Sequence, residues 1–146
     1  MMKLIPEDVM SSFSFSVQVQ IRFSDIDGYM HVNNGVYFSY LEHARAHYLY
    51  KVCDWDIMET GTVVANISID YRTPIHVKDK IEVFVRCNHV GNTSFVLEQV
   101  IMGEKESGEV KIFAQASTTM VSVDMVNMRP VPVPEVYASK MRGFSS

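Results

Sequence analysis

Four segments in the later part of the chain alternate apolar and polar residues, which is the spacing of half-buried β-strands. Turn residues separate them: Gly91 and Asn92 are a strong hairpin signal, and residues 103–108 form a second, more charged turn. Pro74 is expected to stop the first of the four. The segments cover residues 63–71, 80–90, 93–102 and 110–123. Strands joined by such short turns pair antiparallel, so the pattern predicts one antiparallel sheet.

One long helix precedes these strands. Its apolar residues recur at steps of four, three and four: Tyr37, Leu41, Ala44 and Tyr48. We expect the helix to end between Lys51 and Asp54. Before it, a flexible start leads into a strictly alternating strand over residues 13–23. A short helical turn is predicted over residues 54–59, capped by Asp54, and a closing helix over residues 135–142. The apolar parity changes within residues 110–123, which suggests a bulge or a two-sided strand.

This order predicts an α+β fold, with an antiparallel sheet of about five strands and one long helix against it. The 146 residues fit a single domain, residues 1–146, able to bury a core without disulfides. One helix cannot cover five long strands, so part of the sheet or its edge is expected to be buried in a homodimer.

Composition excludes several classes of function. A hydrophobic content of 47% with 21% charged residues is ordinary for a globular protein, and a net charge of −4 argues against nucleic-acid binding. Cys53 and Cys87 form no metal or redox motif, which favours a reduced, cytoplasmic chain. Pro6 and the acids after it break the N-terminal apolar run, so we expect no signal peptide and no membrane span.

The most chemically suggestive stretch is the loop of residues 25–35, immediately before the helix. A carboxylate, an imidazole and two amides are packed into it: Asp27, His31, Asn33 and Asn34. Free backbone N–H groups and the positive end of the helix dipole lie at the junction and favour developing negative charge. This is a suitable arrangement for attack on a carbonyl group.

The motifs of this loop and helix resemble those of hot-dog-fold acyl thioesterases, the 4-hydroxybenzoyl-CoA thioesterase-like family in its His-Val-Asn-Asn branch. They begin with Asp25-Ile26-Asp27, His31-Val32-Asn33-Asn34, Tyr37 and Glu42-His43-Ala44-Arg45. The similarity continues through residues 69–74, 77–79 and 91–95 and ends with residues 129–132. It therefore extends over nearly the whole chain.

The resemblance implies a long helix wrapped by a curved antiparallel sheet, dimerised through that sheet, with active sites at the dimer interface. It implies that Asp27 is the catalytic acid and that the backbone of Asn34 polarises the thioester carbonyl. His31 and Asn33 are implied to orient water or substrate, and Glu42 to position water in the acyl site.

Each of these residues also has a structural interpretation. Asp27 before Gly28 is typical of an Asx-type turn, and Asp25 of a turn or strand-end cap. Asn33 and Asn34 are natural helix caps, a role compatible with catalysis because the backbone after a cap supplies the donors. Glu42 pairs with Arg45 at three residues' spacing in the simplest alternative.

The candidate substrate-binding residues are one tyrosine and three cations. Tyr37 either lines the acyl pocket or belongs to the core. The cations either bind the phosphates of coenzyme A or lie on solvated faces: Arg72, Lys78 and Arg86. His43 and His47 have a metal-compatible spacing without a third ligand, so we expect no metal.

We therefore predict a cytoplasmic thioester hydrolase that converts acyl-CoA to free acid and coenzyme A without a cofactor. Asp27 acts either as nucleophile or as general base. A homodimer, possibly a tetramer, is expected. The alternatives are an acyl-carrier-protein thioesterase and a non-catalytic module that binds acyl thioesters or fatty acids.

Overall fold

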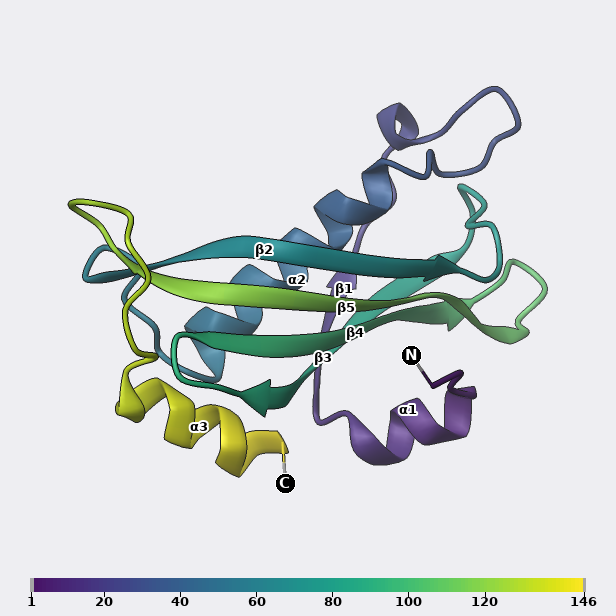
Figure 1. Cartoon of the computed structure of the whole chain (residues 1–146). Helices are drawn as coiled ribbons and strands as arrows, with labels where there is room; N and C mark the ends of the chain where they lie inside the picture. The colour runs from purple at the N-terminus through teal and green to yellow at the C-terminus, as the bar shows by residue number, and fades with distance from the viewer. Residues whose placement is uncertain (1, 146) are drawn as a thin grey trace.

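The computed structural model describes residues 2–145. Five strands form one antiparallel sheet in the order β1-β3-β4-β5-β2, and a long helix, α2, runs behind it (Figure 1). The elements are α1 (Pro6–Ser12), β1 (Phe15–Val19), the 3-10 turn η1 (Phe23–Asp25), α2 (Val36–Lys51), β2 (Thr60–Tyr71), β3 (Lys80–Val90), β4 (Ser94–Glu104), β5 (Val110–Asp124) and α3 (Glu135–Ser145). The α+β class, the antiparallel pairing and the long helix are confirmed.

The two faces of the sheet have separate cores. On β3, Ile81, Val83 and Val85 belong to the main core with α2, whereas Phe84 belongs to a smaller cluster with Val9 of α1. Because successive residues of a strand point to opposite faces, α1 and α2 cover opposite sides of the sheet.

Two predictions for the N-terminal part of the chain were wrong. Residues 6–12 form a helix rather than a flexible start: Pro6 occupies its first turn, and the backbone N–H of Ile5 bonds to the Asp8 carboxylate at 3.0 Å. The alternating strand predicted over residues 13–23 is limited to Phe15–Val19, since only these residues pair with β3. The chain beyond them turns through η1 into the loop before α2.

The helical turn predicted over residues 54–59 is reduced to a single turn that starts at Asp56. The N–H groups of Glu59 and Thr60 bond to the carbonyl of Asp56 at 3.2 and 3.1 Å, and Asp56, not Asp54, caps the turn by accepting the N–H of Met58 at 3.0 Å. Asp54 has a positive φ of 54°, which ends the preceding helix by turning the chain, and the N–H of Trp55 bonds to the carbonyl of Leu49 at 3.0 Å. Gly61, expected to end that turn, instead lies in β2, where an added Cβ would approach Sδ of Met125 to 2.4 Å.

The later strands follow the sequence pattern closely. β3 has the predicted bounds, and the N–H of Gly91 closes the expected hairpin on the carbonyl of Ser94 at 2.7 Å. β5 has a bulge at Phe113, between the residues that pair with Ile101 and Met102, which is upstream of the change in apolar parity after Ala116 from which the irregularity was predicted. The strand is also buried on both faces over residues 112–116, and the closing helix is confirmed as α3.

Two features bear on the site. β2 forms one edge of the sheet and, among the described residues, pairs only with β5, so its outer side is a free strand edge twelve residues long. Among the described helices, none combines the length and the apolar character that crossing a membrane requires.

Candidate active site

The loop between η1 and α2 is a small hairpin that is anchored to the body of the protein. Ile26 and Val32 form an antiparallel bridge, and the N–H of Asp27 bonds to the carbonyl of His31 at 2.8 Å. The N–H of Val32 bonds to the carbonyl of Ile75 at 2.8 Å. The loop projects at the end of the molecule where α2 begins (Figure 1). The backbone bonds within the loop and to Ile75 fix its position there.

Asp27 lies at the tip of this hairpin and is exposed. Its Oδ1 accepts the N–H groups of Tyr29 at 2.8 Å and His31 at 3.3 Å, which is the Asx-type turn expected from the sequence. Within residues 2–145, its Oδ2 accepts no hydrogen bond. One carboxylate oxygen therefore holds the turn, and the other remains available to a ligand.

Asp25 has a structural role. It is buried, and its carboxylate accepts the Tyr40 hydroxyl at 2.7 Å and the backbone N–H of Arg22 at 2.9 Å. Burial alone raises the pKa of Asp25, but the two hydrogen bonds and the charge of Arg22 outweigh it, so the pKa lies below its ordinary value. The charged carboxylate ties η1 to α2 and so fixes the base of the loop.

The N-terminus of α2 presents backbone donors beside this loop. The side-chain carbonyl of Asn33 accepts the N–H of Gly35 at 2.9 Å, and its backbone carbonyl accepts the N–H of Val36. The carbonyl of Asn34 accepts the Tyr71 hydroxyl at 2.8 Å, which links the helix start to the end of β2. The N–H of exposed Asn34 has no partner among the described residues. It is thus a free donor at the positive end of a helix.

His31 lies on another side of the loop. Its backbone pairs with His76, their rings are 6.1 Å apart, and both line an open depression of about 490 Å³ with Asp79, Lys105 and the turn after β4. Asp79 is already bonded to the Lys105 amine at 2.9 Å. The backbone of His31 therefore bonds to that of Asp27, but its ring lines this depression. The depression is separate from the cavity between α2 and β2 that is described next.

A cavity of about 500 Å³ lies between α2 and β2. Its walls are largely apolar, and two charged residues of α2, Glu42 and Arg45, reach it; the other lining residues are Ala46, Leu49, Tyr50, Trp55, Ile57, Thr62, Val63, Val64 and Met120. Glu42 is exposed, and within residues 2–145 it makes no ion pair with Arg45 closer than 4.0 Å. Burial lowers the pKa of Arg45, and the charge of Glu42 acts against that shift.

Arg45 was expected from the sequence as part of the family motif and as a partner for Glu42, not as a lining residue of a cavity. The signal that it faces the interior is its place on the apolar side of α2, next to Ala44 and one turn from Leu41 and Tyr48. The contribution of β2 to the cavity has no comparable signal, because it depends on how the helix crosses the sheet.

The remaining substrate-binding candidates are not brought together. Tyr37 is buried in the core, where its hydroxyl accepts the N–H of Ile75 at 3.3 Å. Arg72 bonds to Gln115 at 2.9 Å beside the N-terminal segment, and exposed Lys78 lies 3.6 Å from Glu106.

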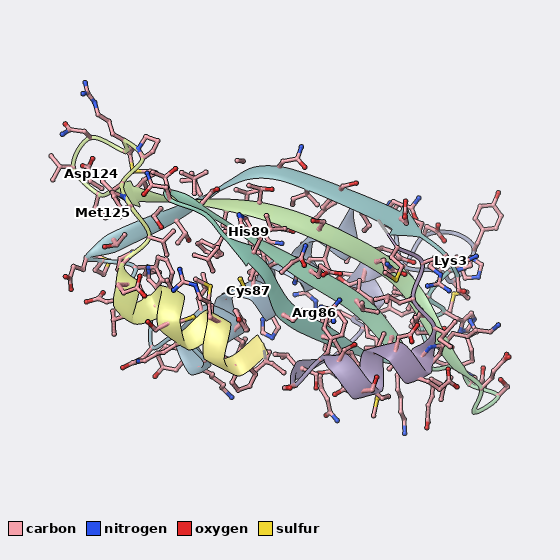
Figure 2. The ribbon with its side chains drawn as sticks, turned by 60° about the horizontal axis from the view of Figure 1, so that its bottom comes forward. Lys3, Arg86, Cys87, His89, Asp124 and Met125 are labelled. Carbon is pink, nitrogen blue, oxygen red and sulfur yellow. The ribbon has the colours of Figure 1, made fainter. Side chains whose placement is uncertain are left out.

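Arg86 lies on β3 close to α1 (Figure 2). It pairs with Glu98 at 3.2 Å, and its guanidinium covers the ring of Phe13 at 4.3 Å. Since α1 and α2 cover opposite faces, this arginine is on the side of the sheet away from the α2–β2 cavity.

The two helix histidines form a close pair. The rings of His43 and His47 are 4.5 Å apart, and burial, the charge of His43 and that of Lys51 lower the pKa of His47. No group of three or more His, Cys, Asp or Glu side chains suited to a metal ion occurs in the described part of the chain. A reaction without metal or organic cofactor stays a prediction.

The geometry defines a class of protein: a long helix enclosed by an antiparallel sheet, with a carboxylate loop at the helix N-terminus and an apolar cavity beside the helix. Residues 21–141 match the model of the thioesterase-like superfamily. The chain is 32% identical to the long-chain acyl-CoA thioesterase FadM of Escherichia coli over an alignment of 120 residues, which covers 74% of this chain and 82% of that protein.

Solved structures agree with this match. A thioesterase of Thermus thermophilus, complexed with coenzyme A and zinc, is 34% identical with a TM-score of 0.77, the match covering 93% of this chain and 98% of that one. 4-Hydroxybenzoyl-CoA thioesterase of Pseudomonas sp. strain CBS-3, at 20% identity, shares the fold with a TM-score of 0.80, covering 88% and 99% of the two chains. The fold is therefore the hot-dog fold. The chain belongs to the thioesterase-like superfamily and is a thioester hydrolase.

Proposed function

We propose that the protein hydrolyses acyl-CoA thioesters, with Asp27 as the catalytic acid and the N–H of Asn34 as the oxyanion donor. The observation that carries this proposal is that one anchored loop holds both a carboxylate oxygen of Asp27 and an N–H of Asn34 that have no partner among the described residues. The names of two relatives, a long-chain acyl-CoA thioesterase and a thioesterase that binds coenzyme A, support the choice of substrate class.

The chemistry requires a group that attacks the carbonyl and a group that stabilises the resulting oxyanion. Asp27 either attacks the carbonyl carbon itself, which expels the coenzyme A thiolate and forms a mixed anhydride that water then hydrolyses to the acid and free Asp27, or it removes a proton from a water that attacks the thioester directly. A backbone donor at a helix N-terminus stabilises the negative charge on the carbonyl oxygen, an effect worth roughly 3–4 kcal/mol per donor in other enzymes. Asn33 contributes by bonding the N–H of Gly35 and so shaping that terminus.

The acyl group is proposed to occupy the cavity between α2 and β2, whose apolar walls suit a hydrocarbon chain. Glu42 at its edge orients water or a polar part of the substrate. Among the three cations proposed for the coenzyme A phosphates, Lys78 is the most accessible, because it is exposed and its one partner, Glu106, is exposed as well, whereas Arg72 and Arg86 are half-buried.

A homodimer formed by pairing the free edges of two β2 strands is part of the proposal. The end of β2 at Tyr71 lies beside the start of α2, through the bond to Asn34, and the end at Thr60 lies near the cavity. Two-fold antiparallel pairing would place the partner's Tyr71 end, with its Asp27 loop, near the cavity of the first subunit. Each site would then combine the loop of one subunit with the cavity of the other.

Thiol release from a panel of acyl-CoA substrates tests the activity, with Asp27→Asn as the decisive variant. Asparagine keeps an oxygen that can accept the N–H groups of Tyr29 and His31, so the turn survives while the charge is lost. We expect kcat to fall by about 10²–10⁴-fold with unchanged thermal stability. Retained activity in this variant would assign Asp27 to the turn alone. Activity on acyl-carrier-protein only, or binding without turnover, would favour the two alternative functions.

Mixed dimers test the composite site. Asp27→Asn is combined with Ala46→Phe, which fills the cavity, after each variant alone has been shown inactive. If loop and cavity come from different subunits, one site of each mixed dimer keeps both intact parts and activity returns. If both parts come from one subunit, the mixture stays inactive. Light scattering on the same samples measures whether the dimer exists.

A cytoplasmic location is also part of the proposal. The finding that supports it is that Cys53 and Cys87 are both buried as thiols and not joined in a disulfide.

A further inference from the structure

Arg45 is a buried cation in the wall of an otherwise largely apolar cavity. It lies on α2, its exposed fraction is 4%, and it lines the α2–β2 cavity opposite Val63 and Val64 of β2. Arginine is seldom buried to this extent without a charged partner. Its surroundings therefore indicate what it binds.

The guanidinium has few partners within the chain. Among residues 2–145 it donates one hydrogen bond, from Nη1 to Oε1 of Gln99 at 3.3 Å, and that oxygen also accepts the Thr118 hydroxyl at 3.3 Å. A guanidinium carries five N–H donors, so most of them are left unused by residues 2–145. No carboxylate of the described residues lies within 4.0 Å of it.

The nearest opposing charge does not complete the site. Glu42 influences Arg45 electrostatically from one turn earlier on α2, but it is exposed and makes no direct contact of ion-pair length. A buried charge that lacks a directly bonded counter-ion destabilises a protein, because desolvation is not offset by an equally strong attraction. An anion in the cavity would remove this penalty.

We propose that Arg45 binds a carboxylate at the distal end of the acyl group, so that the preferred substrates are thioesters of dicarboxylic acids. This inference rests on the proposed function and specifies its substrate class. A carboxylate, unlike a hydroxyl or keto group, both neutralises the buried charge and matches the fork of guanidinium donors. The apolar side chains around it, among them Leu49, Trp55 and Met120, would contact the methylene groups between the two ends.

The position of Arg45 suits this role. It lies ten residues after Gly35 at the start of α2, which corresponds to about 15 Å along the helix axis. A carboxylate bound there does not reach the N–H donor at the start of the same helix, so within one subunit it contributes to substrate selection and not to the reaction. Arg45 is accordingly a specificity residue and not a catalytic one.

The first test compares hydrolysis of paired substrates by the full-length wild-type protein. Hexanedioyl-, octanedioyl-, decanedioyl- and dodecanedioyl-CoA are measured beside the unsubstituted acyl-CoA of each length. We expect at least one dicarboxylic substrate to have the higher kcat/KM of its pair. In Arg45→Met the ratio of kcat/KM for that substrate to kcat/KM for its unsubstituted partner should fall by about 10- to 100-fold. Arg45→Lys, which keeps the charge without the fork, should fall between the two.

Arg142→Met is the matched control, because Arg142 is an exposed arginine on α3 paired with Glu135 at 3.1 Å. It should change neither member of any pair. Thermal unfolding of all variants checks the fold; Arg45→Met removes a buried charge and leaves Gln99 its bond from Thr118, so it should remain folded. A uniform loss on every substrate in a folded Arg45→Met would overturn the proposal and assign Arg45 to a structural or subunit contact. The proposal would also be overturned if the wild-type protein preferred the unsubstituted acyl-CoA at every length.

Calorimetric binding of the free dicarboxylates separates this inference from the proposed function. The wild-type protein should bind octanedioate or decanedioate more tightly than the corresponding monocarboxylate, and Arg45→Met should lose the difference. If no substrate is hydrolysed but this binding is found, the hydrolase proposal fails and the carboxylate site stands. If substrates are hydrolysed but the dicarboxylate gains nothing from Arg45, the site fails alone.

Discussion

Replacing Tyr40 by phenylalanine should destabilise the protein through the buried carboxylate of Asp25. The Tyr40 hydroxyl donates to that carboxylate at 2.7 Å, and Asp25 is only 3% exposed, so water cannot easily replace the lost donor. A hydrogen bond to a charged buried group contributes about 1.5–3 kcal/mol. For a domain of this size we expect the Tm of Tyr40→Phe to fall by roughly 3–12 °C at neutral pH.

The loss should depend on pH in a defined direction. The pKa of folded Asp25 lies below the ordinary value of 3.8, so its charged form stabilises the protein above that value and the contribution disappears as pH falls through the folded pKa. Removing the Tyr40 donor raises the folded pKa. The difference between variant and wild type should therefore shrink below pH 3.8.

Denaturant unfolding of both proteins, at neutral pH and stepwise into the acid range, measures this effect. Tyr50→Phe is the control, because Tyr50 lies on the same helix with 69% exposure and its loss should change the unfolding free energy by no more than about 0.5 kcal/mol. An equal loss for the two variants at neutral pH, or a Tyr40→Phe deficit that persists undiminished in acid, would refute the assignment to charged Asp25.

Three further outcomes are expected. An added Cβ at Gly103 would lie 1.8 Å from the carbonyl of Lys80, so Gly103→Ala should lower the unfolding free energy by about 1–3 kcal/mol or more, as measured by denaturant titration. Burial raises the pKa of Cys53 to about 12 and that of Cys87 to about 11, so neither thiol should react with a thiol reagent at neutral pH until the protein is unfolded; rapid reaction of the native protein would contradict this. Trp55, the single tryptophan, lines the α2–β2 cavity, so its fluorescence should change when a non-hydrolysable acyl-CoA analogue binds to wild type and should not change with free coenzyme A.

Most of the sheet could be predicted because its strands alternate over long runs and end at clear turn residues. The same reasoning missed α1, which has only seven residues and a single buried one, Val9. Its start carries recognisable signals, Pro6 and the capping Asp8, but its packing depends on the smaller apolar cluster on the outer face of the sheet. Asp54 shows the opposite error: a residue type that begins helices instead ends one here, through a positive φ that the sequence does not encode by itself.

The candidate site was predictable only in part, for a related physical reason. Its loop is local, so the residues that hold and surround Asp27 are close in sequence and their motifs could be recognised. The cavity is not local: it joins residues 42–50 of α2 to residues 62–64 of β2 and to Met120 of β5, and its shape follows from packing across the sheet. Arg45 therefore looked like a surface partner of Glu42, although its place on the buried side of α2 gave a usable signal.

The turn and the proposed catalytic role of Asp27 depend on the same arrangement. A carboxylate that was free to rotate would have no fixed position relative to the N–H of Asn34. Oδ1, held by the N–H groups of Tyr29 and His31, fixes the carboxylate plane and leaves Oδ2 exposed at a defined place. The loop is fixed in turn by the bond from Val32 to Ile75 and by buried Asp25 at its base. The hydrogen bonds that support the structural interpretation of Asp27 are thus the ones that would hold a catalytic oxygen in position, which is why Asp27→Asn, and not Asp27→Ala, separates the two roles.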